Sequence, residues 1–445
     1  MIVSVIDYLY LKIQNPWWDN IKSIDDDERI KEFNQLTYRY TPRSILSIKA
    51  VEKDVHIISG PRQTGKSTAL KLYIKQKLGA GVKPTNILYF NCDALSSEKD
   101  IIDLLLEFNK SREGEKTIVL LDEISSVENW PQGIKWLADA DQFKNTTLFL
   151  TGSSSINLKK SGEMLPGRRG KGIDIAFLPI DFYDYLILKG AQVTKIPLNK
   201  VSNSWELQKL AQETQKPYQD FLLTGGFLRN INYGVSEETG ELYLKTLKSK
   251  LFKNGRKEDS LREVLKKIVN SLSAQTSYTN IAEEAELGSK NTAIEYLNFL
   301  ADSYFLKEAK FYDIAQQKVV LKKNKKFYTT DPYIVWLFQS FVTGSLDFES
   351  LRGLVDDSKL AENFIATELT KRGEAVYFYQ NSHETDFFIP NGSIGIEVKY
   401  KNKITNDDIK FPNRLSKKIM ISKDILEVRG DAYIIPAHLF SLLEL

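Results

Sequence analysis

The sequence contains very little cysteine and no long apolar run. Its single cysteine, Cys92, excludes a disulfide framework and suits a reducing compartment. No stretch approaches the roughly 18 consecutive apolar residues that a membrane-spanning helix needs. Residues 1–10 include Asp7 and no basic residue, which is not the pattern of a secretory signal peptide. We therefore expect a soluble, cytoplasmic protein with no membrane partner.

Length and charge narrow the possibilities further. A chain of 445 residues is too long for one ordinary domain, so roughly two to four domains are expected. The net charge is only +3, but residues 245–326 hold 17 lysines and arginines against 10 aspartates and glutamates. This basic middle region predicts a DNA-binding face. The alternative is a solvated, lysine-rich surface without a nucleic-acid partner.

One motif in the N-terminal half is specific for a nucleotide. Residues 55–59 form an apolar run before it, and helix-forming residues follow it to position 78. In such a loop, backbone N–H groups and the start of the next helix bind phosphate oxygens. We predict that this loop binds ATP, that its lysine contacts the β- and γ-phosphates, and that its serine hydroxyl completes a Mg²⁺ shell. The motif is Gly60-Pro61-Arg62-Gln63-Thr64-Gly65-Lys66-Ser67, followed by Thr68.

Short apolar runs alternate with helical patterns around this loop. Such alternation predicts a parallel sheet covered by helices on both faces, an α/β domain. The third run ends in Asp122 and Glu123. We expect Asp122 to hold Mg²⁺ through water and Glu123 to polarise the attacking water, so the predicted activity is ATP hydrolysis. The runs are residues 55–59, 86–91, 117–122, 147–151 and 173–178.

Three polar residues beyond the acidic pair are further candidates for catalysis. Ser153 follows the fourth run and is the candidate sensor of the γ-phosphate, with a turn or helix-capping serine as the alternative. Arg168 and Arg169 lie on a glycine-flanked loop. Either arginine would supply a cation to the transferred phosphate, in the same subunit or in a neighbouring one. The alternative is that both arginines form structural ion pairs.

The basic middle region has the pattern of a winged helix-turn-helix. A helix is predicted at residues 278–287, a second at 290–300, and strand-like segments at 304–312 and 318–329. Lys290, Asn291, Thr292 and Asn298 on the second helix suit a DNA groove. The wing lysines suit phosphate contact, although winged helices also serve as protein-packing modules. These lysines are Lys322, Lys323, Lys325 and Lys326.

At this point the chain resembles a family of prokaryotic AAA-related P-loop ATPases with an N-P-W-W sequence in an N-terminal arm. The resemblance covers nearly the whole chain, although Leu228 stands where a proline often lies near the family's G-G turn. It implies a winged-helix segment followed by a restriction-endonuclease-like domain. The matching segments are Asn15-Pro16-Trp17-Trp18, Thr151-Gly152-Ser153, Gly167-Arg168, Pro179-Ile180-Asp181-Phe182 and Gly225-Gly226.

Pattern and resemblance together predict a multi-domain α/β protein. A parallel-sheet P-loop NTPase of the AAA type is expected to precede a helical subdomain, a winged helix and a small nuclease-like α/β domain. The expected boundaries are 1–45 for the arm, 46–180 for the ATPase core, 181–258 for the helical subdomain, 259–345 for the winged helix and 346–445 for the nuclease-like domain.

The last hundred residues contain a D-(x)n-E-x-K pattern typical of restriction-like nucleases. Asp386 and Glu397 lie on successive predicted strands, and the strand period of two places Glu397 and Lys399 on one face. Glu362 lies on a preceding helix. These residues predict a second Mg²⁺ or Mn²⁺ site, with Lys399 steadying a hydroxide for phosphodiester cleavage. Thr385 departs from the family's proline, and a surviving fold without activity is the alternative.

Three functions follow from these predictions. In the first, ATP hydrolysis controls a DNA-acting, metal-dependent nuclease. In the second, the ATP state gates a partner and the nuclease fold is an inactive scaffold. In the third, the protein is a homo-oligomeric, ATP-driven remodeller in which Arg168 or Arg169 acts across subunits.

Overall fold

A computed structural model describes residues 7–110, 112, 114–153, 165–253, 255–380 and 383–445. The chain divides into two compact units, Met1–Leu178 and Pro179–Leu445. Each unit has its own sheet and is described by itself. Among the described residues, no helix combines the length and the apolar character that crossing a membrane requires.

The N-terminal unit is built on a five-stranded sheet in the order β2-β3-β4-β1-β5. All neighbouring strands are parallel, which confirms the predicted sheet. The four longer strands, β1 to β4, are almost entirely buried, as expected for a sheet covered on both faces. The strands are β1 Val55–Ser59, β2 Ile87–Asn91, β3 Thr117–Asp122, β4 Thr146–Gly152 and β5 Asp174–Ala176.

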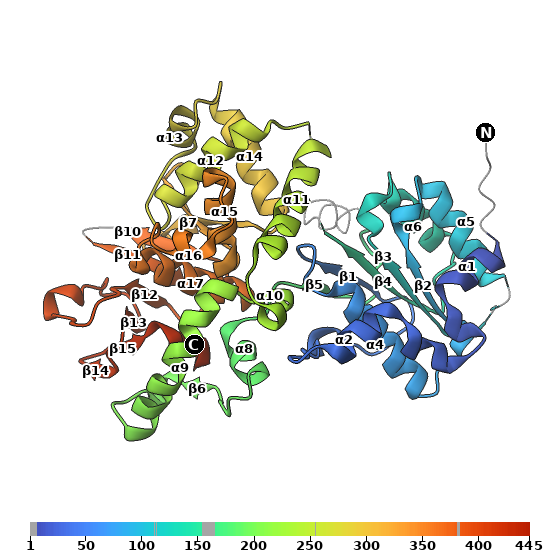
Figure 1. Cartoon of the computed structure of the whole chain (residues 1–445), viewed down its shortest axis with the longest axis horizontal. Coiled ribbons are helices and arrows are strands. Elements are labelled where there is room, and N and C mark those ends of the chain that lie inside the picture. The colour runs from blue at the N-terminus through green and yellow to red at the C-terminus, as the bar shows by residue number, and fades with distance from the viewer. Residues whose placement is uncertain (1–6, 111, 113, 154–164, 254, 381–382) are drawn as a thin grey trace. The chain divides into compact units, whose positions relative to one another are not determined.

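Helices cover both faces of this sheet, with α5 and α6 on one side and α2 and α4 on the other (Figure 1). Helix α5 begins with a capping box in which Ser97 and Asp100 satisfy each other's backbone N–H groups. The helices are α1 Tyr8–Gln14, α2 Glu28–Gln35, α3 Arg43–Leu46, α4 Lys66–Gly79, α5 Glu98–Asn109 and α6 Trp130–Asp139.

The N-P-W-W segment covers the free edge of β2. The Asn15 side chain donates to the carbonyl of Tyr89 at 2.9 Å and accepts from the N–H of Tyr89 at 2.7 Å, as a neighbouring strand would. The indole N–H groups of Trp17 and Trp18 both donate to the carbonyl of Ile87, at 3.2 and 2.8 Å. The arm therefore satisfies an edge that would otherwise expose unpaired backbone groups.

The C-terminal unit contains a nine-stranded mixed sheet. Its order is β14-β15-β13-β12-β11-β10-β7-β8, and β9 pairs with β7. The predicted wing strands β7 and β9 are antiparallel, but β7 also pairs in parallel with β10. The strands are β7 Leu306–Asp313, β8 Lys318–Val319, β9 Lys325–Thr329, β10 Tyr377–Gln380, β11 Glu384–Ile389, β12 Ile394–Val398, β13 Lys417–Ser422, β14 Glu427–Arg429 and β15 Ala432–Pro436.

This sheet crosses the boundary that was expected between residues 345 and 346, because β7 precedes the boundary and β10 follows it. A separate two-stranded pair joins β6 Ile196–Pro197 to β16 Leu443–Glu444. The helices of the unit are α8 Phe182–Leu188, α9 Trp205–Thr224, α10 Leu228–Tyr233, α11 Glu237–Lys253, α12 Glu258–Asn270, α13 Tyr278–Glu284, α14 Lys290–Asp302, α15 Pro332–Thr343, α16 Phe348–Arg352 and α17 Asp357–Lys371.

A buried ion pair organises the start of this unit. Asp331 accepts hydrogen bonds from the N–H of Gly226 at 2.9 Å and from the Lys371 ammonium at 2.8 Å. Lys371 also donates to the carbonyl of Ile180 at 2.9 Å. A Cβ on Gly225 would lie 1.8 Å from an Asp331 oxygen, so the G-G turn requires glycine at that position.

Candidate functional site

The phosphate loop joins the end of β1 to the start of α4. A Cβ on Gly60 would lie 2.1 Å from the carbonyl oxygen of Phe177, so only glycine fits there. Gln63 and Gly65 have φ angles of +64° and +92°, which turn the backbone around the loop. Gly65 is the N-cap of α4, and no side chain caps that helix end. Its N–H groups are therefore available to an anion.

Lys66 is buried inside this loop. Its ammonium donates to the carbonyl oxygens of Gly60 at 2.9 Å and Pro61 at 2.8 Å. Burial lowers the pKa of Lys66, and the charges of Glu123 and Asp122 oppose that effect. β1, which leads into this loop, and β3, which ends in Asp122, both pair with β4, so the loop and the two acids lie at the same carboxyl edge of the sheet.

Two hydroxyl groups hold Asp122 at the end of β3. The Tyr89 hydroxyl on β2 donates to Asp122 Oδ2 at 2.8 Å, and the Thr151 hydroxyl on β4 donates to Oδ1. Thr151 also accepts from the backbone N–H of Glu123 at 3.0 Å. Glu123 itself lies in the left-handed region, at φ +52°. Thr151 therefore bonds to the carboxylate of Asp122 and to the backbone of Glu123, and Tyr89 holds the other carboxylate oxygen of Asp122.

The loop and its acids fit a nucleotide with Mg²⁺. The first helical turn presents uncapped N–H groups, and the side chains of Ser67 and Thr68 on that turn are only half-buried. Asp122 offers a carboxylate at the carboxyl end of β3, held in place by two hydroxyl groups. Oxygen donors of this kind are what Mg²⁺ prefers.

The three other residues predicted for the ATPase site lie in different positions. Ser153 directly follows β4 and is buried. Arg168 pairs with Asp139 at the end of α6, with Nη2 3.2 Å from Oδ2. Arg169 pairs with Asp174 and donates to the carbonyl of Val55. Both arginines thus form ion pairs within the unit.

The backbone of Arg169 lies at the opposite end of β1 from the phosphate loop. Its carbonyl accepts from the N–H of Val55, the first residue of β1, at 3.1 Å. The loop follows Ser59, and at about 3.3 Å per strand residue the two ends of β1 are about 13 Å apart. The backbone of Arg169 therefore lies at the end of β1 away from the loop, and its guanidinium is bonded to Asp174 and the carbonyl of Val55.

The four residues predicted for a nuclease site come together in the C-terminal unit. Asp386 on β11 accepts from the N–H of Val398 on β12 at 2.9 Å. Glu397 on β12 pairs with Lys399 at 2.8 Å. Glu362 on α17 accepts from the Tyr328 hydroxyl at 2.6 Å. The predicted grouping of α17, β11 and β12 residues is therefore present in the structure.

Lys326 is a fifth member of this group, although its place in a lysine-rich segment predicts a position on the wing surface. Its ammonium lies 3.1 Å from Glu362 and 2.8 Å from Asp386, and it also pairs with Glu384. The side chain is 2% exposed. Lys325 is buried too, with its ammonium bonded to the carbonyls of Leu321 and Lys323. The expectation that these two lysines contact phosphate at the wing surface is therefore wrong.

The surroundings of these acids shift their pKa values upward. Burial and the charge of Asp386 raise the pKa of Glu362 to about 7 and that of Glu397 to about 8. Burial alone would lower the pKa of Lys326, but the acidic groups around it raise that pKa well above its ordinary value. The second carboxylate oxygen of Glu397 is buried without a hydrogen-bond partner.

The donor set around Asp386 does not fit a divalent metal ion in this arrangement. The positively charged ammonium of Lys326 donates to Asp386 Oδ1 and the N–H of Val398 donates to Oδ2, so a divalent ion would meet a like charge at this carboxylate, whereas only neutral hydroxyl groups contact Asp122. Within the described part of the chain, no group of three or more His, Cys, Asp or Glu side chains is arranged to hold a metal. The predicted second metal centre therefore stays a prediction.

Exposed basic residues remain on the helix-turn-helix and wing. Lys290, Asn291 and Asn298 on α14 are exposed, as are Lys322 and Lys323 after β8. Thr292 is only half-buried, and its hydroxyl is bonded to that of Ser289, the N-cap of α14. These side chains are the polar surface on which a nucleic-acid contact would depend.

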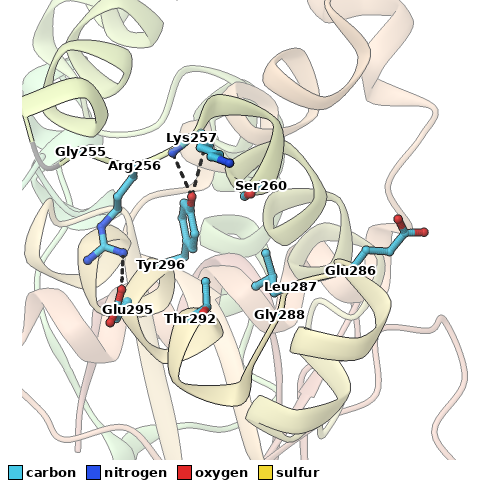
Figure 2. Close-up of a pocket in the computed structure, with 10 residues that line it drawn as sticks. All are labelled: Gly255, Arg256, Lys257, Ser260, Glu286, Leu287, Gly288, Thr292, Glu295 and Tyr296. Carbon is cyan, nitrogen blue, oxygen red and sulfur yellow. Dashed lines mark hydrogen bonds and ion pairs between the residues drawn. The ribbon is translucent and has the colours of Figure 1, made fainter.

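A polar pocket of about 380 Å³ lies between the start of α12 and the turn before α14 (Figure 2). Arg256 pairs with Glu295 at 3.2 Å, and the Tyr296 hydroxyl bonds to the backbone N–H and carbonyl of Lys257. Glu286 lies at the right of the view, apart from the Arg256–Glu295 pair. Two basic and two acidic side chains line the pocket, so its lining carries no net formal charge.

Comparison with protein families gives the class of the N-terminal unit. Residues 52–186 match a family model described as an AAA domain, so they form an AAA-type, ATPase-like domain. This range includes the phosphate loop, Asp122, Glu123 and both arginines. Residues 215–338 and 358–436 match two domains of unknown function, DUF8612 and DUF4143.

Individual proteins are similar to this chain over much of its length. It is 26% identical over 381 residues to an "Uncharacterized protein" of Haemophilus influenzae, covering 83% of this chain and 88% of the relative. The Aeropyrum pernix ORC2 protein, solved as ADPNP-ADP complexes, matches at 14% identity and a TM-score of 0.37, covering 73% and 98%. Cdc6p from Pyrobaculum aerophilum matches at 13% and 0.27, covering 72% and 95%. Structural similarity at this level carries no functional inference.

Proposed function

We propose that this protein is a Mg²⁺-dependent ATPase whose N-terminal unit hydrolyses ATP and thereby switches a nucleic-acid contact of its C-terminal unit. One observation carries the proposal. At the carboxyl edge of the parallel sheet, the loop with Lys66 follows β1 and Asp122 ends β3, and both strands pair with β4, where the Thr151 hydroxyl bonds to the Asp122 carboxylate and to the backbone N–H of Glu123. In open α/β sheets, ligands bind at this edge.

Each residue of this site has a distinct role in the proposed reaction. Residues 60–68 would bind the phosphates through backbone N–H groups, and Lys66 would contact the β- and γ-phosphates. Ser67 and Asp122 would hold Mg²⁺, which when bound neutralises phosphate charge. Glu123 would accept a proton from the attacking water. Ser153 remains the proposed γ-phosphate sensor, and Thr151 orients the two acids.

A cation for the transferred phosphate would come from a second copy of the chain. The backbone of Arg169 lies at the end of β1 away from the loop, and Arg168 precedes it, which favours a second copy over the same subunit. Both arginines pair with acids near the protein surface, from which a neighbouring phosphate would recruit one of them. We therefore propose a homo-oligomer in the ATP-bound state. Such an oligomer is also what the alternative function, an ATP-driven remodeller, requires.

The proposed nucleic-acid partner is DNA, contacted through residues 245–326. Lys290 and Asn291 at the start of α14, with Lys322 and Lys323 in the wing, would bind phosphates and base edges. Such contacts weaken steeply with salt. Loss of salt-sensitive DNA binding in a Lys322→Ala/Lys323→Ala variant is the corresponding test.

Phosphate release from ATP tests the central proposal. We expect Lys66→Ala to lose ATP binding, because the loop loses the ammonium group proposed to contact the terminal phosphates. Glu123→Gln should retain ATP binding and hydrolyse it about 100-fold more slowly, because the proton acceptor is removed. Lys77→Ala, at the far end of α4, is the matched control. Equal hydrolysis by wild-type protein and Lys66→Ala would refute the proposal.

Phosphodiester cleavage is a second candidate function. It is favoured by the buried, unpartnered oxygen of Glu397 beside Lys399, which is a free acceptor in the predicted Mg²⁺ or Mn²⁺ position. Incubation of linear, branched and single-stranded DNA and RNA with Mg²⁺ or Mn²⁺, with and without ATP, tests it. Cleavage that disappears in Asp386→Ala and Lys399→Ala would establish it. The absence of any cleavage leaves the C-terminal unit as a scaffold.

A further inference from the structure

Lys326 lies at the centre of the acidic group in the C-terminal unit. Its carboxylate partners come from two other elements, Glu362 from α17 and Glu384 and Asp386 from β11. An ammonium group donates three hydrogen bonds and accepts none. Lys326 donates hydrogen bonds to Glu362 and Asp386 and forms an ion pair with Glu384, so all three carboxylates pair with this one ammonium.

The carboxylates are oriented toward this ammonium by further hydrogen bonds. Glu362 Oε1 accepts both from Lys326 at 3.1 Å and from the Tyr328 hydroxyl at 2.6 Å. Asp386 directs Oδ1 to Lys326 at 2.8 Å, while its Oδ2 is bonded to the N–H of Val398 at 2.9 Å. The acids that would serve as metal ligands are thus already arranged around a cation that belongs to the chain.

Lys326 has no open route away from these acids. Its side chain is 2% exposed, and the ring of Phe378 lies 5.9 Å from the ammonium. A divalent ion bound to Glu362 and Asp386 would share both ligands with a like charge. Alternatively, the divalent ion would displace the ammonium of Lys326 from its carboxylate partners. The ammonium would then be a buried charge without a partner, which is strongly unfavourable.

We infer that Lys326 is the resident cation of this site and that it excludes Mg²⁺ and Mn²⁺ from Asp386. The inference goes beyond the proposed ATPase and is an alternative to phosphodiester cleavage, the second candidate function, since it makes the nuclease-like arrangement a lysine-occupied scaffold in the wild-type protein. Removal of the ammonium leaves three carboxylates with an excess of negative charge. The emptied position then becomes a divalent-cation site.

The neighbouring lysine supplies a matched control. Lys325 lies on the same strand and is also buried, but its ammonium donates to the carbonyls of Leu321 and Lys323, each at 2.6 Å. Successive strand residues point to opposite faces. Lys325→Met therefore removes a buried lysine from β9 without changing the carboxylates around Asp386.

Mn²⁺ binding to the full-length, nucleotide-free protein, followed by the electron paramagnetic resonance signal of free Mn²⁺, tests the inference. Wild-type protein and Asp386→Asn should bind Mn²⁺ equally. Lys326→Met should bind an additional Mn²⁺ ion per chain, and Lys326→Met/Asp386→Asn should lose it again. Lys325→Met and Lys326→Arg, which keeps the positive charge, should both resemble wild type.

Two results would overturn the inference. The first is Mn²⁺ binding by the wild-type protein that Asp386→Asn abolishes, which remains decisive even if Lys326→Met fails to fold. The second is a folded Lys326→Met protein that gains no Mn²⁺. ATP hydrolysis measured on the same wild-type sample reports separately on the proposed function, because its residues lie in the N-terminal unit. A wild-type protein inactive toward ATP would refute that proposal and leave the Mn²⁺ comparison intact.

Discussion

The residue that holds Asp122 from outside the site, Tyr89, has a second contact that fixes its ring. The ammonium of Lys71 on α4 lies 3.7 Å from the centre of the Tyr89 ring and 4.9 Å from that of Trp17. Lys71 is also paired with Asp27 at 3.0 Å. The Lys71 ammonium therefore contacts the ring of Trp17 in the N-terminal arm and the ring of Tyr89 on β2. These contacts leave the Tyr89 hydroxyl little freedom to turn away from the carboxylate.

Tyr89→Phe should therefore impair ATP hydrolysis while leaving the fold intact. A hydrogen bond to a charged group contributes about 1.5–3 kcal/mol, so we expect about a tenfold loss in kcat. Half-maximal activity should also require more Mg²⁺, because Asp122 is less well oriented. The measurement is the rate of phosphate release across a Mg²⁺ titration.

Tyr73→Phe is the matched control for this variant. It removes a buried hydroxyl that donates to the carbonyl of Ile48 at 3.2 Å, in the same unit but away from Asp122. If the two variants have the same Mg²⁺ dependence as wild type, Tyr89 has no positioning role.

The carboxyl group of Glu368 links stability to pH. It is fully buried, with one oxygen accepting from the N–H of Phe182 at 3.2 Å and the other without a hydrogen-bond partner. Burial and the charge of Asp181 raise its pKa from 4.5 to about 7. Below pH 4.5 the carboxyl is protonated in both folded and unfolded chains. As the pH rises from 4.5 to 7, only the unfolded chain releases the proton, so stability is lost.

Glu368→Gln should therefore make the C-terminal unit less sensitive to pH. The amide keeps an acceptor for Phe182 and removes the titration, which is worth about 2–3 kcal/mol between pH 5 and pH 8. Some dependence should remain, because the raised pKa values of Glu362 and Glu397 act in the same direction. Denaturant midpoints at the two pH values measure this effect. Glu213→Gln, at an exposed position of α9, should retain the wild-type dependence.

Among the elements, the N-terminal arm acts as a cover for the edge strand β2. Asn15 is fully buried and makes two hydrogen bonds to Tyr89. Asn15→Ala leaves both backbone groups of Tyr89 without partners, and we expect a loss of about 2–3 kcal/mol in the free energy of unfolding. Asn34→Ala, exposed on α2, should change it little. Chemical denaturation checks this, and equal stability of the two variants would contradict the role of the arm.

The G-G turn before α10 offers a second prediction for a single element. Gly225 has a φ of +59° and no room for a Cβ next to Asp331, whereas Gly234 has a φ of +81° and no atom within 4 Å. Both alanine variants are strained in the backbone, but only Gly225→Ala also collides with the buried Asp331–Lys371 pair. Gly225→Ala should therefore be less stable than Gly234→Ala by at least about 2 kcal/mol. Thermal unfolding of both variants makes the comparison.

Elements set by local pattern could be predicted from the sequence, and contacts between distant residues could not. The phosphate loop and the strand before Asp122 are visible because glycines and buried apolar runs are local signals. Lys326 resembled a surface lysine, because its partners Glu362 and Asp386 lie 36 and 60 positions away. Tyr89 resembled an ordinary core aromatic residue, because only the strand order places its hydroxyl beside Asp122.

For the whole molecule, the shared sheet makes residues 179–445 one folding unit. The two matched families end at residue 338 and begin at residue 358, yet β7 and β10 pair across that gap. The acidic partners of Lys326 also lie beyond the gap. A winged-helix fragment that ends at residue 345 would therefore expose one edge of β7 and leave a buried lysine without its carboxylates.

A fragment of residues 179–445 should consequently unfold in one cooperative transition, and a fragment of residues 179–345 should not. An unpaired buried charge costs about 3–5 kcal/mol, which is a large part of the stability of an ordinary domain. Thermal unfolding followed by near-ultraviolet circular dichroism distinguishes the two, with a fragment of residues 1–178 as the control for an independent unit. Cooperative unfolding of the shorter fragment would mean that the winged helix is stable without the strands that extend its sheet. The fragment would then be stable although Lys326 lacks its carboxylate partners. That result would contradict the view that these ion pairs are needed to bury Lys326.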